Sequence, residues 1–79
     1  MKTLTGNIQW FDNDEGTVNC NEDGRTYYMH VTAIANESEV SKMKRGAKVE
    51  FTLYTNLYMS QVDTIALVNH HPSKGVTTC

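Results

Sequence analysis

The side chains best suited to chemistry in this sequence are aromatic and imidazole groups, and they gather in one stretch. Trp10, Phe11, Tyr28 and His30 all lie between residues 6 and 34. Exposed rings offer flat surfaces on which unpaired nucleic acid bases can stack. An imidazole can also transfer protons or bind a metal ion. Base stacking and histidine chemistry are therefore the two activities to weigh first.

Catalysis and metal binding lack the partners that they need. No nucleophile or carboxylate stands at a spacing that would fix it beside His30. The sequence has no Gly-rich phosphate loop, no nucleophile elbow and no paired-carboxylate signature. Cys20 and Cys79 lack metal-ligand spacing, and the pair His70-His71 lies in a segment without periodicity. We therefore expect no enzyme, no cofactor and no metal, with Cys20 buried as a small hydrophobe.

The composition is that of one small soluble domain. The 79 residues are 39% hydrophobic and 20% charged, with nine acidic against seven basic side chains and a net charge of −2. No apolar run approaches the ~20 residues of a membrane span, and the first residues lack the apolar region of a secretory signal. We therefore expect a cytoplasmic protein that does not associate with membranes. Any phosphate binding must depend on local basic charge.

Three short runs in the first part of the chain are separated by turn residues. Asn7–Asp12, Thr17–Asn21 and Arg25–Val31 read as strands, because Gly, Asn and Asp in the gaps supply the positive φ of tight turns. The pattern predicts a three-stranded antiparallel meander. Alternation of period two separates two sets of side chains in the second and third runs: Val18, Cys20, Tyr27, Met29 and Val31 against Thr17, Asn19, Tyr28 and His30.

The second half of the chain predicts two further strands. Lys48–Tyr54 is one, with Val49, Phe51 and Leu53 facing inward. The other lies within residues 58–68, where the apolar positions require a bulge near Asp63 or Thr64. Tyr54 and Tyr58 flank the intervening turn, and we expect them to stabilise this hairpin across its strands.

The long connection, residues 35–47, can hold a short helical turn over Ser38–Met43, with Val40 and Met43 facing the body. Residues 70–79 have no periodicity, which is typical of a flexible tail. A meander, a crossover and a hairpin predict an all-β fold, a small five-stranded antiparallel OB-type Greek-key barrel over residues 1–69. An SH3-like barrel is the structural alternative.

Several short motifs resemble the bacterial cold-shock domain family across about residues 4–68. The family motifs are, in order, G-x-V-K-W-F-N, K-G-F-G-F-I, D-G, V-F-V-H-F-S-A-I and L-x-x-G-x-x-V-x-F. The residues that match them, in the same order, are Gly6, Trp10-Phe11, Gly16, Asp23-Gly24, His30, Ala33-Ile34, and Met43 with Gly46, Val49 and Phe51. The resemblance supports the OB-type barrel. It also implies binding of single-stranded RNA or DNA, as an RNA chaperone or a modulator of gene expression.

The resemblance implies a reduced binding face. Trp10, Tyr28 and His30, together with Phe11, would form the aromatic platform, although Phe11 could equally lie at the edge of the core. Three positions at which the family carries aromatic residues hold other side chains here: Thr17, Asn19 and Val31. Gln9 and Glu15 stand where the family has lysines. Because each stacked base contributes roughly 1–3 kcal/mol, we expect weakened binding.

The distribution of charged residues is also consistent with a second function. Asp12, Asp14 and Glu15 are close to Trp10 in sequence, whereas basic residues gather in the long connection as Lys42, Lys44, Arg45 and Lys48. These basic residues form a solvated loop, a displaced phosphate contact or a docking patch. The alternative to nucleic-acid binding is a repurposed barrel that regulates or inhibits a basic, nucleic-acid-handling protein. We expect a monomer or a weak homodimer that pairs through the open face.

Overall fold

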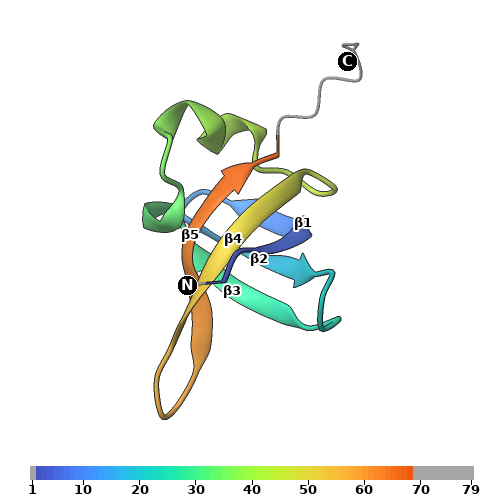
Figure 1. Ribbon diagram of the computed structural model, residues 1–79. Coiled ribbons are helices and arrows are strands. Elements are labelled where there is room, and N and C mark those ends of the chain that lie inside the picture. Colours follow the sequence, from blue (N-terminus) through green and yellow to red (C-terminus); the bar gives the residue numbers. More distant parts are fainter. Residues whose placement is uncertain (1, 69–79) are drawn as a thin grey trace.

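The computed structural model describes residues 2–68, which form a closed five-stranded β-barrel (Figure 1). The strands are β1 (Leu4–Asp12), β2 (Glu15–Cys20), β3 (Thr26–His30), β4 (Lys48–Thr55) and β5 (Ser60–Leu67). Their order around the barrel is β1-β2-β3-β5-β4, and β4 pairs with β1 to close it. The predicted all-β, OB-type barrel is thus confirmed. The expected tail, with His70, His71 and Cys79, lies outside the described residues.

One strand pair differs from the antiparallel barrel that the sequence predicts. Tyr28 of β3 pairs with Gln61 of β5 in parallel, and a parallel bridge joins Ile34 to Ile65. An odd number of strands cannot close into a ring with every neighbouring pair antiparallel. The long connection between β3 and β4 therefore delivers the last hairpin so that β5 meets β3 in the same direction.

The period-two patterns place the core as the sequence predicts. One face of each strand is buried, and the core comprises Ile8, Val18, Cys20, Met29, Ala33, Ile34, Met43, Val49, Phe51, Val62 and Ile65. Tyr27 and Leu53 are half-buried and pack against this cluster. Burial raises the pKa of the Cys20 thiol, which keeps it protonated, as expected of a small buried hydrophobe.

Two bulges adjust the strands to this core. In β1, Ile8 opposes Val18 but Trp10 opposes Thr17, so Gln9 is the extra residue. In β5, Thr64 opposes Thr52 and Val62 opposes Leu53, so Asp63 is the extra residue, as the apolar spacing predicts. Each bulge changes which side of the sheet the following side chains face.

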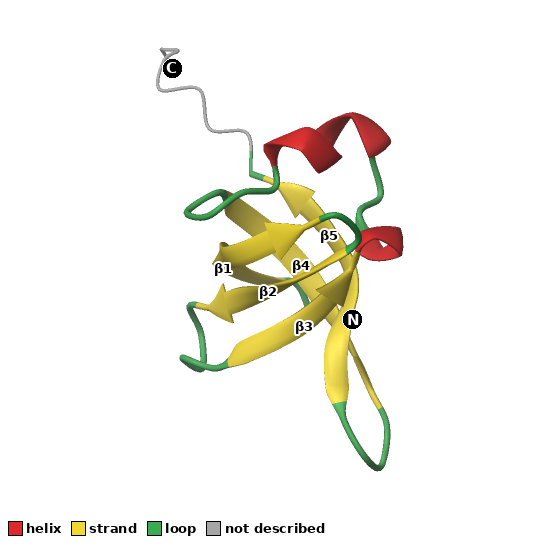
Figure 2. Ribbon diagram, turned by 180° about the vertical axis from the view of Figure 1, so that it is seen from behind, coloured by secondary structure: helices red, strands yellow, loops and turns green. Residues whose placement is uncertain are grey.

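Two 3₁₀ helices occupy the connection between β3 and β4: η1 (Val31–Ala33) and η2 (Glu37–Lys42). They lie at the end of the barrel opposite the β4–β5 turn (Figure 2). Helix η2 confirms the predicted turn, with Met43 buried and Val40 half-buried. The third strand is shorter than the sequence predicts: the predicted run extends to Val31, whereas β3 ends at His30 and η1 begins at Val31. Neither helix is long and apolar enough to cross a membrane, and the same holds throughout residues 2–68.

The turn between β2 and β3 is held by two carboxylates. Glu22 accepts hydrogen bonds from the backbone N (3.0 Å) and the Oγ1 (2.9 Å) of Thr5. Asp23 accepts from the Oη of Tyr27 (2.5 Å) and the backbone N of Arg25 (2.8 Å). These bonds lower the pKa of both carboxyl groups. Gly24 completes the turn with a φ of 72°, the left-handed conformation that glycine adopts without strain.

Candidate nucleic-acid interface

The bulge in β1 turns Trp10 out of the barrel. Ile8, two residues earlier, is 1% exposed, whereas Trp10 is 44% exposed. The extra residue, Gln9, is fixed by its Oε1, which accepts a hydrogen bond of 2.7 Å from the Oγ1 of Thr17. The resemblance implies an outward Trp10, and the bulge is the local feature that produces it.

Trp10 lies in line with an exposed tyrosine. Trp10 opposes Thr17 across the β1–β2 pair, and Thr17 opposes Tyr28 across the β2–β3 pair. Residues directly opposite each other in a sheet project from the same face. Trp10, Thr17 and Tyr28 therefore form one outward line across three strands, hereafter the aromatic row. Tyr28 is 36% exposed.

The row has a threonine where a third ring would complete it. Thr17 and Asn19 are half-buried on the outer face of β2, while Val18 between them is fully buried. Asn19 is held by Thr26, whose Oγ1 donates to its Oδ1 (2.8 Å). The outward placement of Thr17 and Asn19 agrees with the sequence prediction, and both positions lack a π-surface.

Phe11 does not belong to the aromatic row. It opposes Gly16, which is buried on the inner face of β2, and its ring packs against the core cluster. Glycine is required at position 16, because a Cβ there would collide with the backbone carbonyl of Trp10 and lie 2.9 Å from Cδ1 of Phe11. Of the two placements that the sequence leaves open, the structure gives the core edge. Val31 is also half-buried and packed against the core.

Acidic side chains border the row at the β1–β2 turn. Asp12 opposes Glu15, and Glu15 opposes His30, so a second cross-strand line runs beside the aromatic row. The Oη of Tyr28 donates to Oε1 of Glu15 at 3.2 Å. Desolvation, this hydrogen bond and the negative charges of Glu15 and Asp14 raise the pKa of the Tyr28 phenol. Asp12, Asp14 and Glu15 are hereafter the acidic turn.

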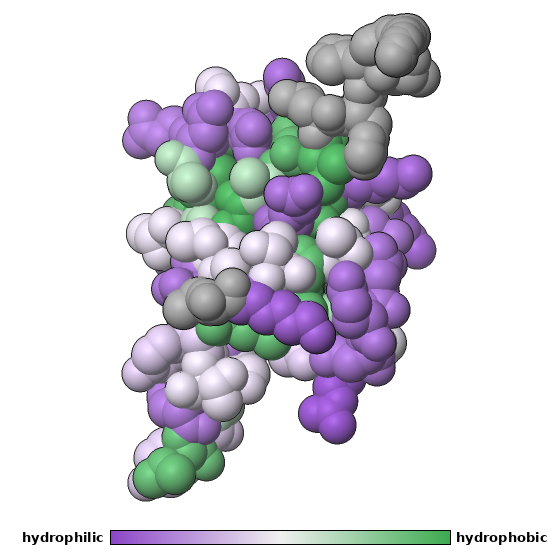
Figure 3. Space-filling view, viewed as in Figure 1, coloured by the Kyte–Doolittle hydropathy of each residue, from purple (hydrophilic) through white to green (hydrophobic). Residues whose placement is uncertain are grey.

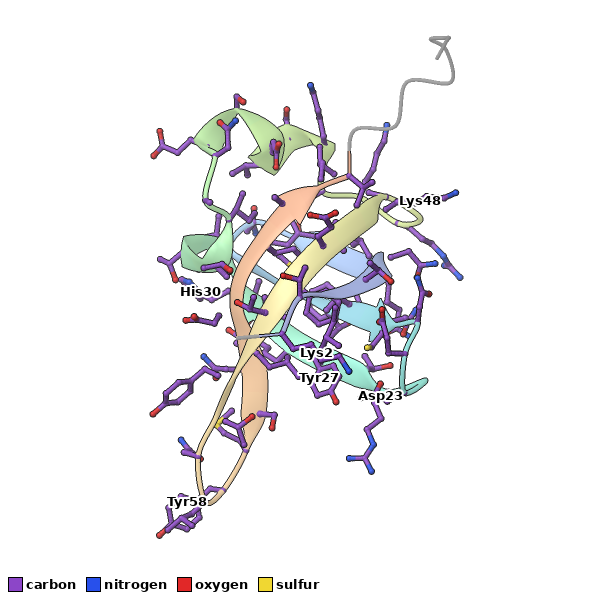
Figure 4. The ribbon with its side chains drawn as sticks, viewed as in Figure 1. Lys2, Asp23, Tyr27, His30, Lys48 and Tyr58 are labelled. Carbon is purple, nitrogen blue, oxygen red and sulfur yellow. The ribbon has the colours of Figure 1, made fainter. Side chains whose placement is uncertain are left out.

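His30 has a structural partner that the sequence does not indicate. It is half-buried beside η1 (Figure 4), and its Nδ1 accepts from the backbone N of Thr32 at 3.2 Å, which caps the helix. The Nδ1 also lies 3.1 Å from Oγ1 of Thr32. The capping bond fixes the ring at the end of the acidic line. Across residues 2–68, no group of three or more His, Cys, Asp or Glu side chains could hold a metal ion.

Basic residues approach the other side of β1. Backbone hydrogen bonds from Gly46 N to Ile8 O (2.8 Å) and from Ile8 N to Ala47 O (2.9 Å) hold the turn that carries Lys44 and Arg45 against this strand. Lys48 follows on β4, opposite Asn7. Lys44, Arg45 and Lys48 are all exposed and are hereafter the basic strip. Lys42 is exposed as well, at the end of η2, where its backbone O accepts from Lys44 N (3.0 Å).

One of the two hairpin tyrosines differs from the sequence prediction. Tyr54 is a cross-strand residue opposite Gln61, whereas Tyr58 lies in the turn, outside the paired residues, and is 91% exposed. A polar pair also bridges the strands, with 2.9 Å between Thr55 Oγ1 and Ser60 Oγ. In the sequence, the exposed apolar hairpin is indicated by one signal, the absence of any charged residue from Phe51 to Val62.

Comparison with known proteins found no match from which a function could be inferred, so the functional argument rests on the geometry of the aromatic row and its surroundings. No protein-family model matches the chain, and no match was found among curated proteins.

Proposed function

We propose that this protein binds single-stranded RNA or DNA weakly, by stacking unpaired bases on Trp10 and Tyr28. The observation that carries the proposal is the aromatic row, which presents both rings outward on one face of the barrel. A ring stacks on any base, so this surface suits unpaired strands of mixed sequence. The resemblance to cold-shock domains points to the same ligand, with a role in RNA chaperoning or gene-expression control in the cytoplasm.

The charged residues around β1 support a particular path for a bound nucleic-acid strand. The basic strip adjoins β1 on its β4 side, where Lys44, Arg45 and Lys48 would contact phosphates. Lys42, at the end of η2 two residues before Lys44, would add a further contact. The acidic turn lies alongside the aromatic row, at the β1–β2 turn, and repels phosphate. We propose that phosphates run along the basic strip while bases lie over Trp10 and Tyr28. Few phosphate contacts give a shallow dependence of affinity on salt.

The test is a titration of a labelled pyrimidine-rich oligonucleotide, followed by fluorescence anisotropy at low and moderate salt, with Trp10 emission as a second readout. Trp10→Ala and Tyr28→Ala should each weaken binding by about 5- to 150-fold, the equivalent of one lost stack. Tyr58→Ala is the control, because it removes an even more exposed ring that lies in the β4–β5 turn, outside the row. Flat titrations with folded wild-type protein would refute the proposal.

A second candidate function follows from the acidic turn. Glu15 is bonded to Tyr28, so carboxylates and an aromatic ring share one surface. Aromatic residues at a centre with charge at the rim are typical of protein interfaces. A basic, nucleic-acid-handling protein would fit this surface, and the chain would then act as its regulator. Capture of such a protein should survive nuclease treatment and be abolished by Glu15→Lys. Capture that nuclease abolishes would contradict this function.

A further inference from the structure

The β4–β5 hairpin projects from the barrel without support from other strands. Pairing of β4 with β1 ends at Phe51, and β5 meets β3 at Gln61. The intervening segment extends well beyond the barrel body (Figure 1). Residues 52–60 therefore form an arm, closed by the pair Thr55–Ser60, beside which no third strand is paired within residues 2–68.

The turn at the tip of the arm is held by hydrogen bonds. The Oδ1 of Asn56 accepts hydrogen bonds from the backbone N of Tyr58 (2.8 Å) and of Met59 (3.0 Å), and Asn56 N donates to Met59 O (3.0 Å). These bonds satisfy the turn without any apolar packing. The turn therefore presents the side chains of Leu57 and Tyr58 to solvent.

The tip is also apolar. Leu57 is 93% exposed and Tyr58 91%, and Tyr54 and Met59 are about half exposed. These four are most of the large apolar side chains that residues 2–68 expose, and the hydrophobic atoms at the end of the arm are evident in Figure 3. No charged residue lies between Glu50 and Asp63. A preorganised, apolar and uncharged projection is suited to a dry contact rather than to phosphates.

One edge of the arm can also form a sheet. From Thr52 to Thr55, β4 has no strand on the side that β1 occupies further along, within residues 2–68. Exposed edges in other proteins are protected by lysine, proline or a bulge. Residues 52–55 include no lysine or proline, and the bulge opposite Thr52 and Leu53 inserts its extra residue, Asp63, on β5 rather than on this edge. The free edge therefore offers unpaired backbone groups to another strand.

We propose that this edge pairs with the same edge of a second copy of this chain, forming a two-fold symmetric dimer. Identical antiparallel segments are self-complementary, so one surface suffices. Two copies with a net charge of −2 repel each other, and the uncharged arm lets them approach without placing like charges opposite each other. In this arrangement each apolar tip reaches the start of β1 in the other copy, beside half-buried Leu4. Such a small interface forms a weak dimer.

The test is sedimentation of the full chain from about 10 µM to about 1 mM, the range in which an interface of this size should dimerise. Wild type should shift from monomer to dimer. Tyr54→Lys, which sets two positive charges beside the two-fold axis, and the double variant Leu57→Ser with Tyr58→Ser should each weaken dimerisation by at least about tenfold. Ser41→Lys is the matched control, because it adds the same charge on η2 and should leave the dimer intact.

Amide hydrogen exchange provides a second measurement, since protection within residues 52–55 should rise with protein concentration. The replaced side chains are exposed, so the variants should remain folded, which circular dichroism checks. A monomer at every concentration would overturn the proposal. A dimer insensitive to the arm but lost in Tyr28→Ala would place the contact on the aromatic row. A monomeric protein whose arm variants lose oligonucleotide affinity would assign the tip to nucleic acid.

Discussion

Filling the gap in the aromatic row tests directly whether bases stack there. Thr17 lies between Trp10 and Tyr28, opposite each of them in the sheet, and its side chain is directed outward. Thr17→Phe would place a third ring in the line without entering the core. One added stack contributes roughly 1–3 kcal/mol. Oligonucleotide affinity should therefore rise about 5- to 150-fold.

The cost of this change to the fold is small. The substitution removes the 2.7 Å hydrogen bond to Gln9, which contributes about 0.5–1.5 kcal/mol. New cross-strand contacts of the ring with Trp10 and Tyr28 return roughly 0.2–1 kcal/mol each. The free energy of unfolding should thus change by no more than about 1.5 kcal/mol in either direction. Urea denaturation measures this term separately from binding.

Thr17→Val is the matched control, because it removes the same hydroxyl and adds no ring. Anisotropy titrations of both variants against wild type, at one low salt concentration, isolate the contribution of the ring. Equal affinities of the Phe and Val variants, with both proteins folded, would refute the stacking argument. Equal salt dependence of the two variants is also expected, since neither substitution changes a phosphate contact.

Three further predictions concern the fold. Phe51→Ala should lower the free energy of unfolding by about 3–5 kcal/mol in urea denaturation, because the side chain is 1% exposed; a loss under about 1 kcal/mol would contradict its core role. Gly16→Ala should lower the free energy of unfolding and shift Trp10 fluorescence emission, since the added methyl group collides with the Trp10 carbonyl. An unchanged emission spectrum and stability would contradict the requirement for glycine between β1 and β2. Glu22 and Asp23 have folded-state pKa values below the ordinary 4.5 and 3.8, so their contribution is complete above those values and is lost as pH falls through the folded-state values. Unfolding midpoints between pH 2 and pH 6 should therefore depend less on pH in the variant Glu22→Gln with Asp23→Asn, and parallel curves would disprove this origin.

Alternation in the sequence was sufficient to predict most of the barrel. Val18, Met29 and Phe51 each fall on the inward side of a period-two pattern, and all are buried. The bulge at Asp63 was predictable for the same reason, because apolar positions on either side of it fall out of phase. Strand ends were less accurate. The strand-like run that begins at Asn7 in the sequence is longer in the structure, where β1 begins at Leu4, since β4 pairs with residues 4–7 in the closed barrel.

The candidate site was predictable in its residues but not in its surroundings. The sequence and the family resemblance identified Trp10 and Tyr28 as exposed rings, and both are. The hydrogen bond from Tyr28 to Glu15 and the cap that His30 provides to η1 connect side chains whose spacing carries no pattern. Phe11 remained undecided, because the bulge before it determines which face it takes.

The sequence by itself determined which side chains avoid water, since alternation and turn residues are local properties of the chain. It thereby determined the number of strands, the composition of the core and the outward line of Thr17 and Asn19. Only the tertiary structure decided how the ring of strands closes, with β5 parallel to β3, and how far the β4–β5 arm extends past its neighbours. It also brought the acidic turn to Tyr28 and the basic strip to β1. These outcomes depend on contacts between residues distant in sequence, which form only when the barrel closes.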